Sequence, residues 1–199
     1  VDLYLGEGTT STLDNSTINI PDPDDPSQMN PSKGGAGLQV RNKGNLIIHG
    51  PGTLKAQGSS GGAGIGGFTD ATGNITILGG RIEATGGEAA AGIGSGSKGK
   101  CGNISIKNDA EVVAIGGDAK EYKVNGVVES TQPGGPGIGH AQTYESSGGN
   151  IDISGGKVFA IGGTVEKGST DLTTGILCDT LSSLDGSGDI FTNDTSLTG

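Results

Sequence analysis

Apolar and polar residues alternate with a period of two in short segments of this chain. In "NITILGGRIEAT", Ile75, Ile77, Ile82 and Ala84 alternate with polar side chains, and a Gly-Gly pair separates the two halves. Successive side chains of a strand point to opposite faces, so alternation over four or five residues between glycine turns is typical of short half-buried strands. The pattern therefore predicts an all-β chain.

The same pattern is repeated along the sequence. Four segments align, namely "GNLIIHGPGTLKAQG", "GNITILGGRIEATGG", "GNISIKNDAEVVAIGG" and "GNIDISGGKVFAIGG", and elements such as "GGAGIGG" and "GGPGIGH" recur between them. The asparagines that open them, Asn45, Asn74, Asn103 and Asn150, are 29, 29 and 47 residues apart, and we expect them to stack as an amide ladder at a turn. We interpret the chain as a right-handed, single-stranded parallel β-helix of about six turns with three short strands per turn, forming one domain over residues 1–199.

Superposing the repeats predicts columns of like side chains. The inward columns are Leu46, Ile75, Ile104 and Ile151; Leu54, Ile82, Val112 and Val158; and Ala56, Ala84, Ala114 and Ala160. A narrow core of this kind agrees with an aromatic content of only 3%. An outward column of Thr53, Arg81, Glu111 and Lys157 alternates in charge, and we expect Lys107 and Asp152 to form a salt bridge across adjacent turns.

Three insertions, at residues 21–33, 118–132 and 164–173, lengthen the repeats between the second and third predicted strands. Because they leave the coil at the same corner, we expect them to cluster on one flank. Insertions that share a face of a repeat protein often form its binding face.

The candidate ligand-binding residues lie in the loops of these flanks. They are Tyr122 and Tyr144, with His140 and Glu145 close to the second tyrosine. A loop tyrosine can stack on the apolar face of a sugar ring while its hydroxyl group bonds to ring substituents. The alternative is that the tyrosines cover strand edges. Phe159, predicted to face outward, is either a binding platform or covered by an insertion.

The segment "DPDDP" supplies a candidate metal site. Asp22, Asp24 and Asp25 offer the hard oxygen ligands that calcium prefers. The segment has no terminal bidentate glutamate, so a stiff solvated turn is the alternative. Calcium is the one candidate cofactor, and no cofactor is required by the pattern.

Composition and charge exclude several classes of function. A formal net charge of −10 argues against binding nucleic acid, whose phosphates require a basic face. No apolar run approaches the roughly 18 residues that a membrane-spanning helix needs. The "GAGIGG" motif lacks the following helix on which phosphate binding depends. We identify no catalytic residues, because the outward columns hold no pair of acids.

The segments "EGTTSTLDNS", "GGAGLQVRNKGNLIIHGPGTLKAQG" and "GNITILGGRIEATGG" resemble the carbohydrate-binding β-helix domains of secreted and cell-surface bacterial proteins. This family includes the type that binds polygalacturonate and Gly-rich repeat arrays of large surface proteins. The resemblance covers roughly residues 1–193. It implies an extracellular parallel β-helix, acidic polysaccharide binding in some members and calcium in some, but it transfers no individual binding residue.

These observations predict a non-catalytic polysaccharide-binding module of a secreted or cell-surface bacterial protein, joined to neighbouring domains. Acidic polysaccharides are among the candidate ligands. One alternative is a structural stalk or adhesin spacer that contacts protein partners. A second alternative is a polysaccharide lyase or hydrolase.

Overall fold

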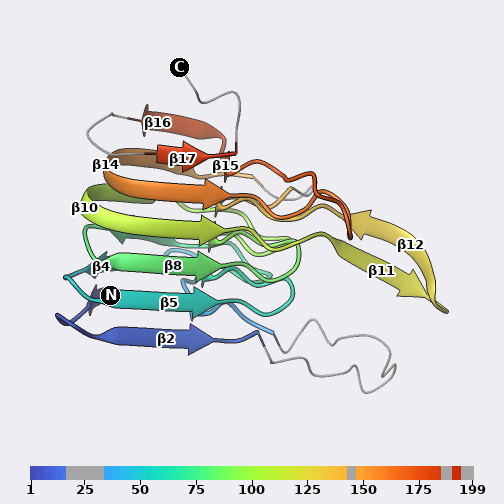
Figure 1. Ribbon diagram of the computed structural model, residues 1–199, viewed down its shortest axis with the longest axis horizontal. Helices are drawn as coiled ribbons and strands as arrows, with labels where there is room; N and C mark the ends of the chain where they lie inside the picture. Colours follow the sequence, from blue (N-terminus) through green and yellow to red (C-terminus); the bar gives the residue numbers. More distant parts are fainter. Residues whose placement is uncertain (17–33, 143–146, 185–189, 194–199) are drawn as a thin grey trace.

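The computed structural model describes residues 1–16, 34–142, 147–184 and 190–193. The regular elements in these ranges are β-strands (Figure 1). Apart from one antiparallel hairpin, they are stacked in parallel from β2 (Thr10–Asp14) at one end to β16 (Thr180–Leu184) and β17 (Ile190–Thr192) at the other. The prediction of an all-β chain is confirmed.

Ten strands form one parallel sheet that curves into a half-barrel. Its strands follow the order β1-β4-β7-β10-β8-β5-β2, while β14 pairs with β10, β16 and β17. The remaining bounds are β1 (Asp2–Tyr4), β4 (Asn45–His49), β5 (Thr53–Gln57), β7 (Asn74–Ile77), β8 (Arg81–Thr85), β10 (Ile104–Ile115) and β14 (Asn150–Ile161). The first and second strands of each repeat therefore belong to the same sheet.

A separate parallel sheet contains five strands of two residues each. They are β3 (Leu38–Gln39), β6 (Ile65–Gly66), β9 (Ile93–Gly94), β13 (Ile138–Gly139) and β15 (Ile176–Leu177). Glycine stands at the second position of the three inner strands, β6, β9 and β13, where close stacking requires it: a Cβ atom on Gly94, whose φ is 137°, would lie 2.0 Å from the carbonyl oxygen of Gly139.

The predicted architecture, a single-stranded β-helix with three short strands per turn, is wrong. The structure instead contains a parallel half-barrel and a separate parallel sheet. The two differ because the corner between the first and second predicted strands does not interrupt β10 and β14, which are continuous over 12 residues each. Asn108 and Gly156 take positive φ angles of 57° and 77° there, and these bend the strand while its pairing resumes after a bulge.

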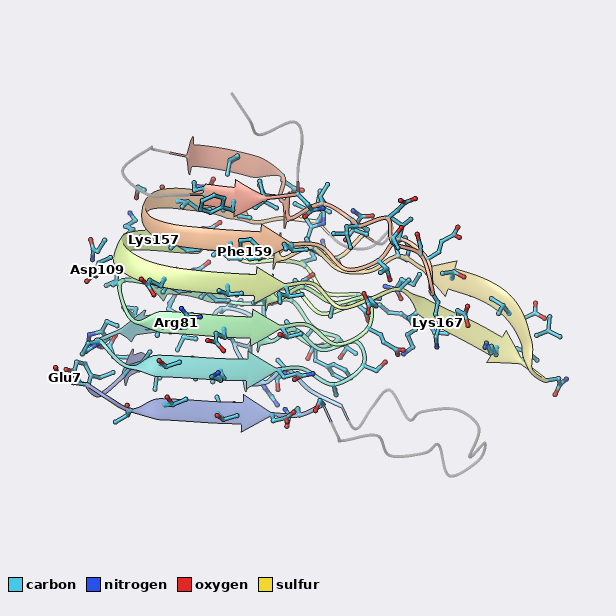
Figure 2. The ribbon with its side chains drawn as sticks, viewed as in Figure 1. Glu7, Arg81, Asp109, Lys157, Phe159 and Lys167 are labelled. Carbon is cyan, nitrogen blue, oxygen red and sulfur yellow. The ribbon has the colours of Figure 1, made fainter. Side chains whose placement is uncertain are left out.

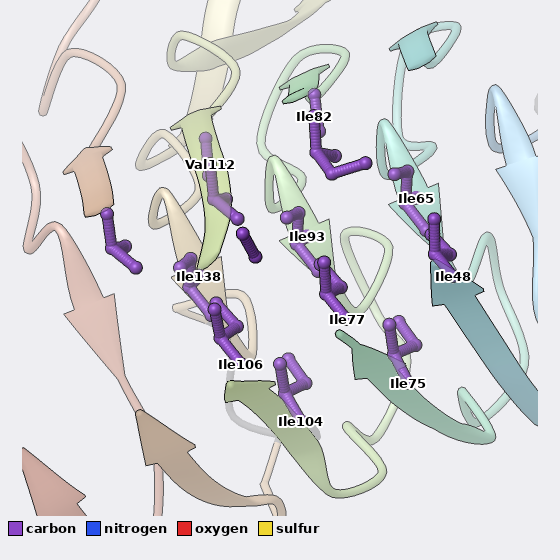
Figure 3. Packing of buried hydrophobic residues seen from close by; sticks show 14 of the residues in the cluster. Ile48, Ile65, Ile75, Ile77, Ile82, Ile93, Ile104, Ile106, Val112 and Ile138 are labelled. Atoms are coloured by element: carbon purple, nitrogen blue, oxygen red, sulfur yellow. The ribbon is translucent and has the colours of Figure 1, made fainter. Parts of the chain in front are cut away.

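The interior of the half-barrel holds the predicted columns (Figure 3). Ile82 pairs in register with Val112, Ala84 with Ala114, and Ile75 with Ile104. The column of Ala56, Ala84, Ala114 and Ala160 is continuous and buried. These columns are confirmed, and burial of each isoleucine contributes about 1.5–3 kcal/mol.

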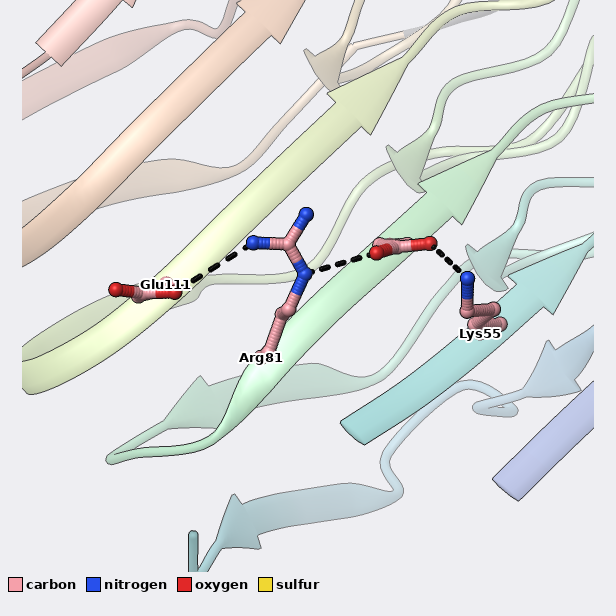
Figure 4. A network of polar contacts seen from close by, with 4 residues as sticks. Lys55, Arg81 and Glu111 are labelled. Atoms are coloured by element: carbon pink, nitrogen blue, oxygen red, sulfur yellow. Dashed lines mark hydrogen bonds and ion pairs between the residues drawn. The ribbon is translucent and has the colours of Figure 1, made fainter. Parts of the chain in front are cut away.

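The outer face of the half-barrel carries ion pairs between adjacent strands (Figure 4). Glu83 lies 2.7 Å from Lys55 Nζ and 2.8 Å from Arg81 Nε, and Arg81 also lies 3.6 Å from Glu111. These contacts hold the pKa of Glu83 below its usual value, with the hydrogen bond from Lys55 as the largest cause. The predicted Lys107–Asp152 salt bridge is also present, at 3.1 Å.

The asparagines that open the repeats form the predicted ladder. Asn74 Nδ2 donates to Asn45 Oδ1 at 2.8 Å, and Asn74 Oδ1 in turn accepts from the backbone N–H of Asn103 at 3.1 Å. Asn103 Oδ1 accepts from the N–H of Asn150 at the same distance. The side-chain amides thus continue the hydrogen bonding of the sheet along the stack.

The insertions differ in structure. Residues 118–132 contain an antiparallel hairpin of β11 (Lys120–Val124) and β12 (Val127–Gln132), which projects from the stacked repeats (Figure 1). Its turn is Asn125-Gly126, with φ angles of 50° and 81°, as a two-residue hairpin turn requires. Residues 164–173 form a short loop closed by a bridge between Thr164 and Leu172. The insertion at 21–33 lies outside the described residues.

Candidate functional site

A groove runs along the corner where the second strands end. It has a volume of about 730 Å³ and is lined by the second-strand ends of three consecutive repeats, by Ser16 and by residues of two insertions. We refer to its glycines as the floor and to its polar residues from the corner and the insertions as the wall. The groove is therefore built from one corner of the fold that recurs in every repeat.

The floor consists of Gly58, Gly86, Gly87, Gly116 and Gly117. A Cβ atom on Gly87 would lie 1.7 Å from the carbonyl oxygen of Ser59, and one on Gly117 would lie 1.7 Å from that of Gly87. Such contacts are too short for any other residue type. The requirement for close stacking thus leaves a floor of bare backbone.

The strand ends contribute Gln57, Thr85 and Ile115, which point outward from β5, β8 and β10. They are paired in register, with Gln57 beside Thr85 and Thr85 beside Ile115. Because strands in a sheet lie about 4.8 Å apart, the groove presents one such side chain at each step of that length.

The wall begins with a chain of polar contacts. Lys120 Nζ donates to Ser60 Oγ at 2.9 Å, and that hydroxyl group donates to Glu88 Oε2 at 3.0 Å. Burial lowers the pKa of Lys120, while the charge of Glu88 acts in the opposite direction. The base of the hairpin is thereby fixed against the corner.

The wall continues where the two described insertions meet. The backbone N–H of Thr164 donates to Asp118 Oδ1 at 3.1 Å, and the N–H of Ala119 donates to Thr164 Oγ1 at 3.3 Å. Lys167 and Ser169 from the second insertion also line the groove. These two insertions therefore lie side by side, whereas the position of residues 21–33 on the same flank stays a prediction.

Tyr122 lies in the middle of β11 and does not line the groove. Its hydroxyl group donates to Gln132 Oε1 at 2.9 Å, Gln132 Nε2 donates to the carbonyl oxygen of Ser97 at 2.8 Å, and Lys120 Nζ lies 5.3 Å from the ring centroid. Burial, with a smaller effect of Glu88, raises the pKa of Tyr122. The ring supports the wall through these contacts.

His140 follows β13 in the five-stranded sheet and belongs to a different network. Its Nε2 lies 3.5 Å from Asp179 Oδ1, and its Nδ1 lies 3.1 Å from the carbonyl oxygen of Ala141. Asp179 Oδ2 also accepts a hydrogen bond from the N–H of Gly148 at 2.7 Å. The structure thus does not bring His140 together with Tyr122.

Several candidate residues lie outside the described residues. They are Tyr144 and Glu145 of the predicted ligand site, and Asp22, Asp24 and Asp25 of the predicted calcium site. Within the described ranges, no group of three or more His, Cys, Asp or Glu side chains is arranged to hold a metal ion. The calcium site therefore stays a prediction.

Phe159 faces outward, as predicted, and 42% of its surface is exposed. It pairs in register with Val113 on one side and with Phe191 on the other, which is 60% exposed (Figure 2). An apolar strip therefore crosses three strands near the C-terminal end of the half-barrel.

Both cysteines are free thiols in this structure. Cys101 is buried, and this burial raises its pKa to about 12, while Cys178 is partly exposed. The thiol of Cys101 therefore remains protonated and has the character of a core side chain.

Comparisons of the chain with family models, with curated proteins and with solved structures found no match. A search of the described residues found no helix long and apolar enough to cross a membrane. The geometry of the groove is thus the observation from which function is argued.

Thr85, Glu88 and Lys167 were not among the predicted site residues. The prediction rested on loop tyrosines and their polar neighbours, whereas the groove is lined by glycine, hydroxyl and carboxylate groups. The signal that points to it is the combination of repeated Gly-Gly corners with insertions that begin at the same corner, at Asp118 and Thr164.

Proposed function

We propose that this chain is a non-catalytic polysaccharide-binding module that holds a sugar chain along the corner groove. The observation that carries the proposal is an open groove of about 730 Å³ that crosses three equivalent repeats. Equivalent positions recur about every 4.8 Å along it. A polymer of repeated sugars fits such a site because the glycine floor recurs at each step, so that successive residues of the polymer meet the same backbone surface.

The chemistry of the lining matches the two kinds of surface on a sugar. A pyranose ring has flat C–H faces and an edge of hydroxyl groups. The glycine floor and Ile115 offer flat and apolar surface to a ring face, while Gln57, Glu88 and Asp118 offer hydrogen-bonding partners at the edge.

The proposal includes an extracellular location, in a secreted or cell-surface bacterial protein with neighbouring domains. Support for this part comes from the resemblance of the repeats to carbohydrate-binding domains of such proteins. A non-catalytic role is proposed because the groove is lined by single carboxylates held in structural hydrogen bonds, such as Glu88 with Ser60.

The test is affinity electrophoresis in native gels that contain a panel of soluble polysaccharides, with Thr85→Met as the groove variant. Thr85 is a half-buried, outward-facing threonine at the middle of the groove. The longer side chain should obstruct the groove and weaken binding by about tenfold, which equals about 1.4 kcal/mol.

The matched control is Thr76→Met, the same substitution at a half-buried, outward-facing threonine of β7, away from the groove. It should leave the retardation unchanged. Equal losses in both variants, or no retardation of the unmodified chain by any polysaccharide, would refute the proposal.

A second candidate function, a structural spacer that contacts a protein partner, is favoured by the tip of the hairpin. Val124, Val127 and Val128 are exposed there by 56%, 62% and 45%. If the full-length protein captures a partner and Val124→Ser together with Val127→Ser abolishes capture while Thr85→Met does not, the spacer function is supported. The reverse pattern supports the groove.

A further inference from the structure

Negative charges outnumber positive charges among the residues that line the groove. Among its lining residues the charged side chains are Glu88, Asp118 and Lys167, so that two carboxylates face one ammonium group. The whole chain carries a formal net charge of −10. A ligand that carries many negative charges would therefore be repelled by the groove and by the protein as a whole.

Lys120, the second basic residue of the wall, is hydrogen-bonded within the wall itself. Lys120 Nζ donates to Ser60 Oγ, and the same hydroxyl group is bonded to Glu88. The ammonium group is also 5.3 Å from the centroid of the Tyr122 ring. Its charge is thus directed into the wall, where it offsets Glu88 rather than attracting an anion into the groove.

The backbone of the floor offers no free donors at its five glycines. The N–H groups of Gly58, Gly86 and Gly116 donate to the carbonyl oxygens of Thr85, Ile115 and Ile161 at 2.8–3.0 Å. Those of Gly87 and Gly117 donate to Gly62 and Ala90. Anion-binding loops depend on N–H groups that point at the ligand, and here the stacking of repeats uses all five.

The carboxylates of the groove favour a ligand that donates hydrogen bonds from hydroxyl groups. Among the residues that the structure describes, Asp118 receives one hydrogen bond, from Thr164, and Glu88 receives one from Ser60, so each carboxylate retains acceptor capacity there. Hydrogen bonds from a hydroxyl group to a carboxylate are stronger than those between neutral groups. A carboxylate or sulfate on the ligand would instead face like charges in successive repeats.

From these observations we infer that the corner groove selects a polysaccharide of uncharged sugars and rejects chains of uronic acids or sulfated sugars. The inference rests on the proposed function and narrows its ligand class. It departs from the acidic polysaccharides that the family resemblance suggests, because the lining sets one cation, Lys167, against two carboxylates and because the N–H groups of the five floor glycines are already bonded.

The experiment measures retardation of the whole protein in two sets of native gels. One set contains neutral polysaccharides, such as a soluble glucan, a galactomannan or a neutral xylan, and the other contains polygalacturonate or alginate. We expect retardation by at least one neutral chain and none by the acidic chains. Raising the salt from about 0.01 M to about 1 M shortens the Debye length from about 30 to about 3 Å, so binding to a neutral chain should change less than twofold.

The variant Glu88→Gln with Asp118→Asn removes both carboxylates and keeps the side-chain carbonyl acceptors. Its matched control is Glu7→Gln with Asp109→Asn, which removes two exposed carboxylates at the far end of the half-barrel strands (Figure 2). The groove variant should bind neutral chains several-fold more weakly than the control and should show a smaller difference between neutral and acidic chains.

The outcomes separate the inference from the proposed function. Stronger retardation by polygalacturonate or alginate than by any neutral chain would overturn the inference and leave polysaccharide binding intact. Equal behaviour of the groove variant and its control towards neutral chains would also overturn it. No retardation by any chain would remove the proposed function itself.

Discussion

The stacked repeats and the projecting hairpin are built from similar residue types but bury them differently. In the half-barrel Val112 and Val158 are 2% and 1% exposed, because each has a neighbour in register above or below and a core behind it. In the hairpin Val124 and Val127 are more than half exposed. A β-branched residue is thus a core residue only where its strand has a second layer to pack against.

The comparison also applies to the two faces of one strand. In β8, Ile82 and Ala84 are buried and nearly identical in character to their partners in the adjacent repeats, whereas Arg81, Glu83 and Thr85 vary from repeat to repeat. Stacking therefore constrains the inner columns and leaves the outer columns free to acquire a binding surface.

The largest effect is expected from Ile106→Ala. Ile106 is fully buried between Ile77 and Ile153 in its column, so truncation should lower the free energy of unfolding by about 2–5 kcal/mol. Urea denaturation measures this loss. The control is Ser105→Ala at the neighbouring outward position, which should lower the free energy of unfolding by about 1 kcal/mol or less. Similar losses at the two positions would contradict the described orientation of β10.

An intermediate effect is expected when the alanine column is enlarged. Ala84→Val adds volume between Ala56 and Ala114 and should destabilise by about 1–3 kcal/mol. A valine introduced on the outer face of the same strand, in Thr85→Val, should change the free energy of unfolding by no more than about 0.5 kcal/mol. Thermal unfolding of both variants tests this; a tolerated valine at position 84 would show that the column is loosely packed.

A smaller, pH-dependent effect is expected for Glu83→Gln. Lys55 and Arg81 lower the pKa of Glu83 in the folded state. The stabilisation is therefore fully present above the ordinary glutamate pKa of about 4.3 and is lost as the pH falls through the lowered folded-state value. At neutral pH the variant should be less stable by up to about 1 kcal/mol. The effect is small because Glu83 and its partners Lys55 and Arg81 are partly exposed to solvent.

The difference between this variant and the unmodified chain should shrink in acid and in high salt, as measured by urea denaturation across pH. A difference that is independent of pH would mean that packing, and not the charge of Glu83, is responsible.

The smallest effect is expected in the hairpin. Val127→Ser at the exposed tip should leave the free energy of unfolding within about 0.5 kcal/mol of the unmodified value. The equivalent change in the half-barrel, Val112→Ser, should be strongly destabilising because it places a hydroxyl group in an apolar core. A large loss at Val127 would show that the hairpin packs against another part of the molecule.

Much of the core could be predicted from the sequence because its columns follow directly from the repeat. The alignment that pairs Ile75 with Ile104 and Ala84 with Ala114 is the register of the structure. The division into sheets could not be predicted in this way. Whether a strand continues through a corner depends on local backbone angles, such as the positive φ of Asn108, and glycine or asparagine at a corner permits both results.

Less of the groove than of the core could be predicted. The expected proximity of two insertions is confirmed by the hydrogen bond between Thr164 and Asp118, whereas the prediction of Tyr122 as a ligand-binding residue followed the general preference of sugars for aromatic rings and stays untested. The hydroxyl group of Tyr122 is bonded within the hairpin to Gln132, a partner ten residues away whose position depends on the turn between them. Contacts of that kind arise only after the insertion has folded.

The hydrogen bonds between repeats, including those of the asparagine ladder, run along the direction in which the repeats are stacked. Strands β2 and β16 lie at opposite ends of that stack (Figure 1). Tension applied through these end strands would open the bonds one layer after another, whereas a load parallel to the strands would have to shear a whole ladder at once. The molecule should therefore lengthen stepwise under axial pulling and resist lateral force as a unit.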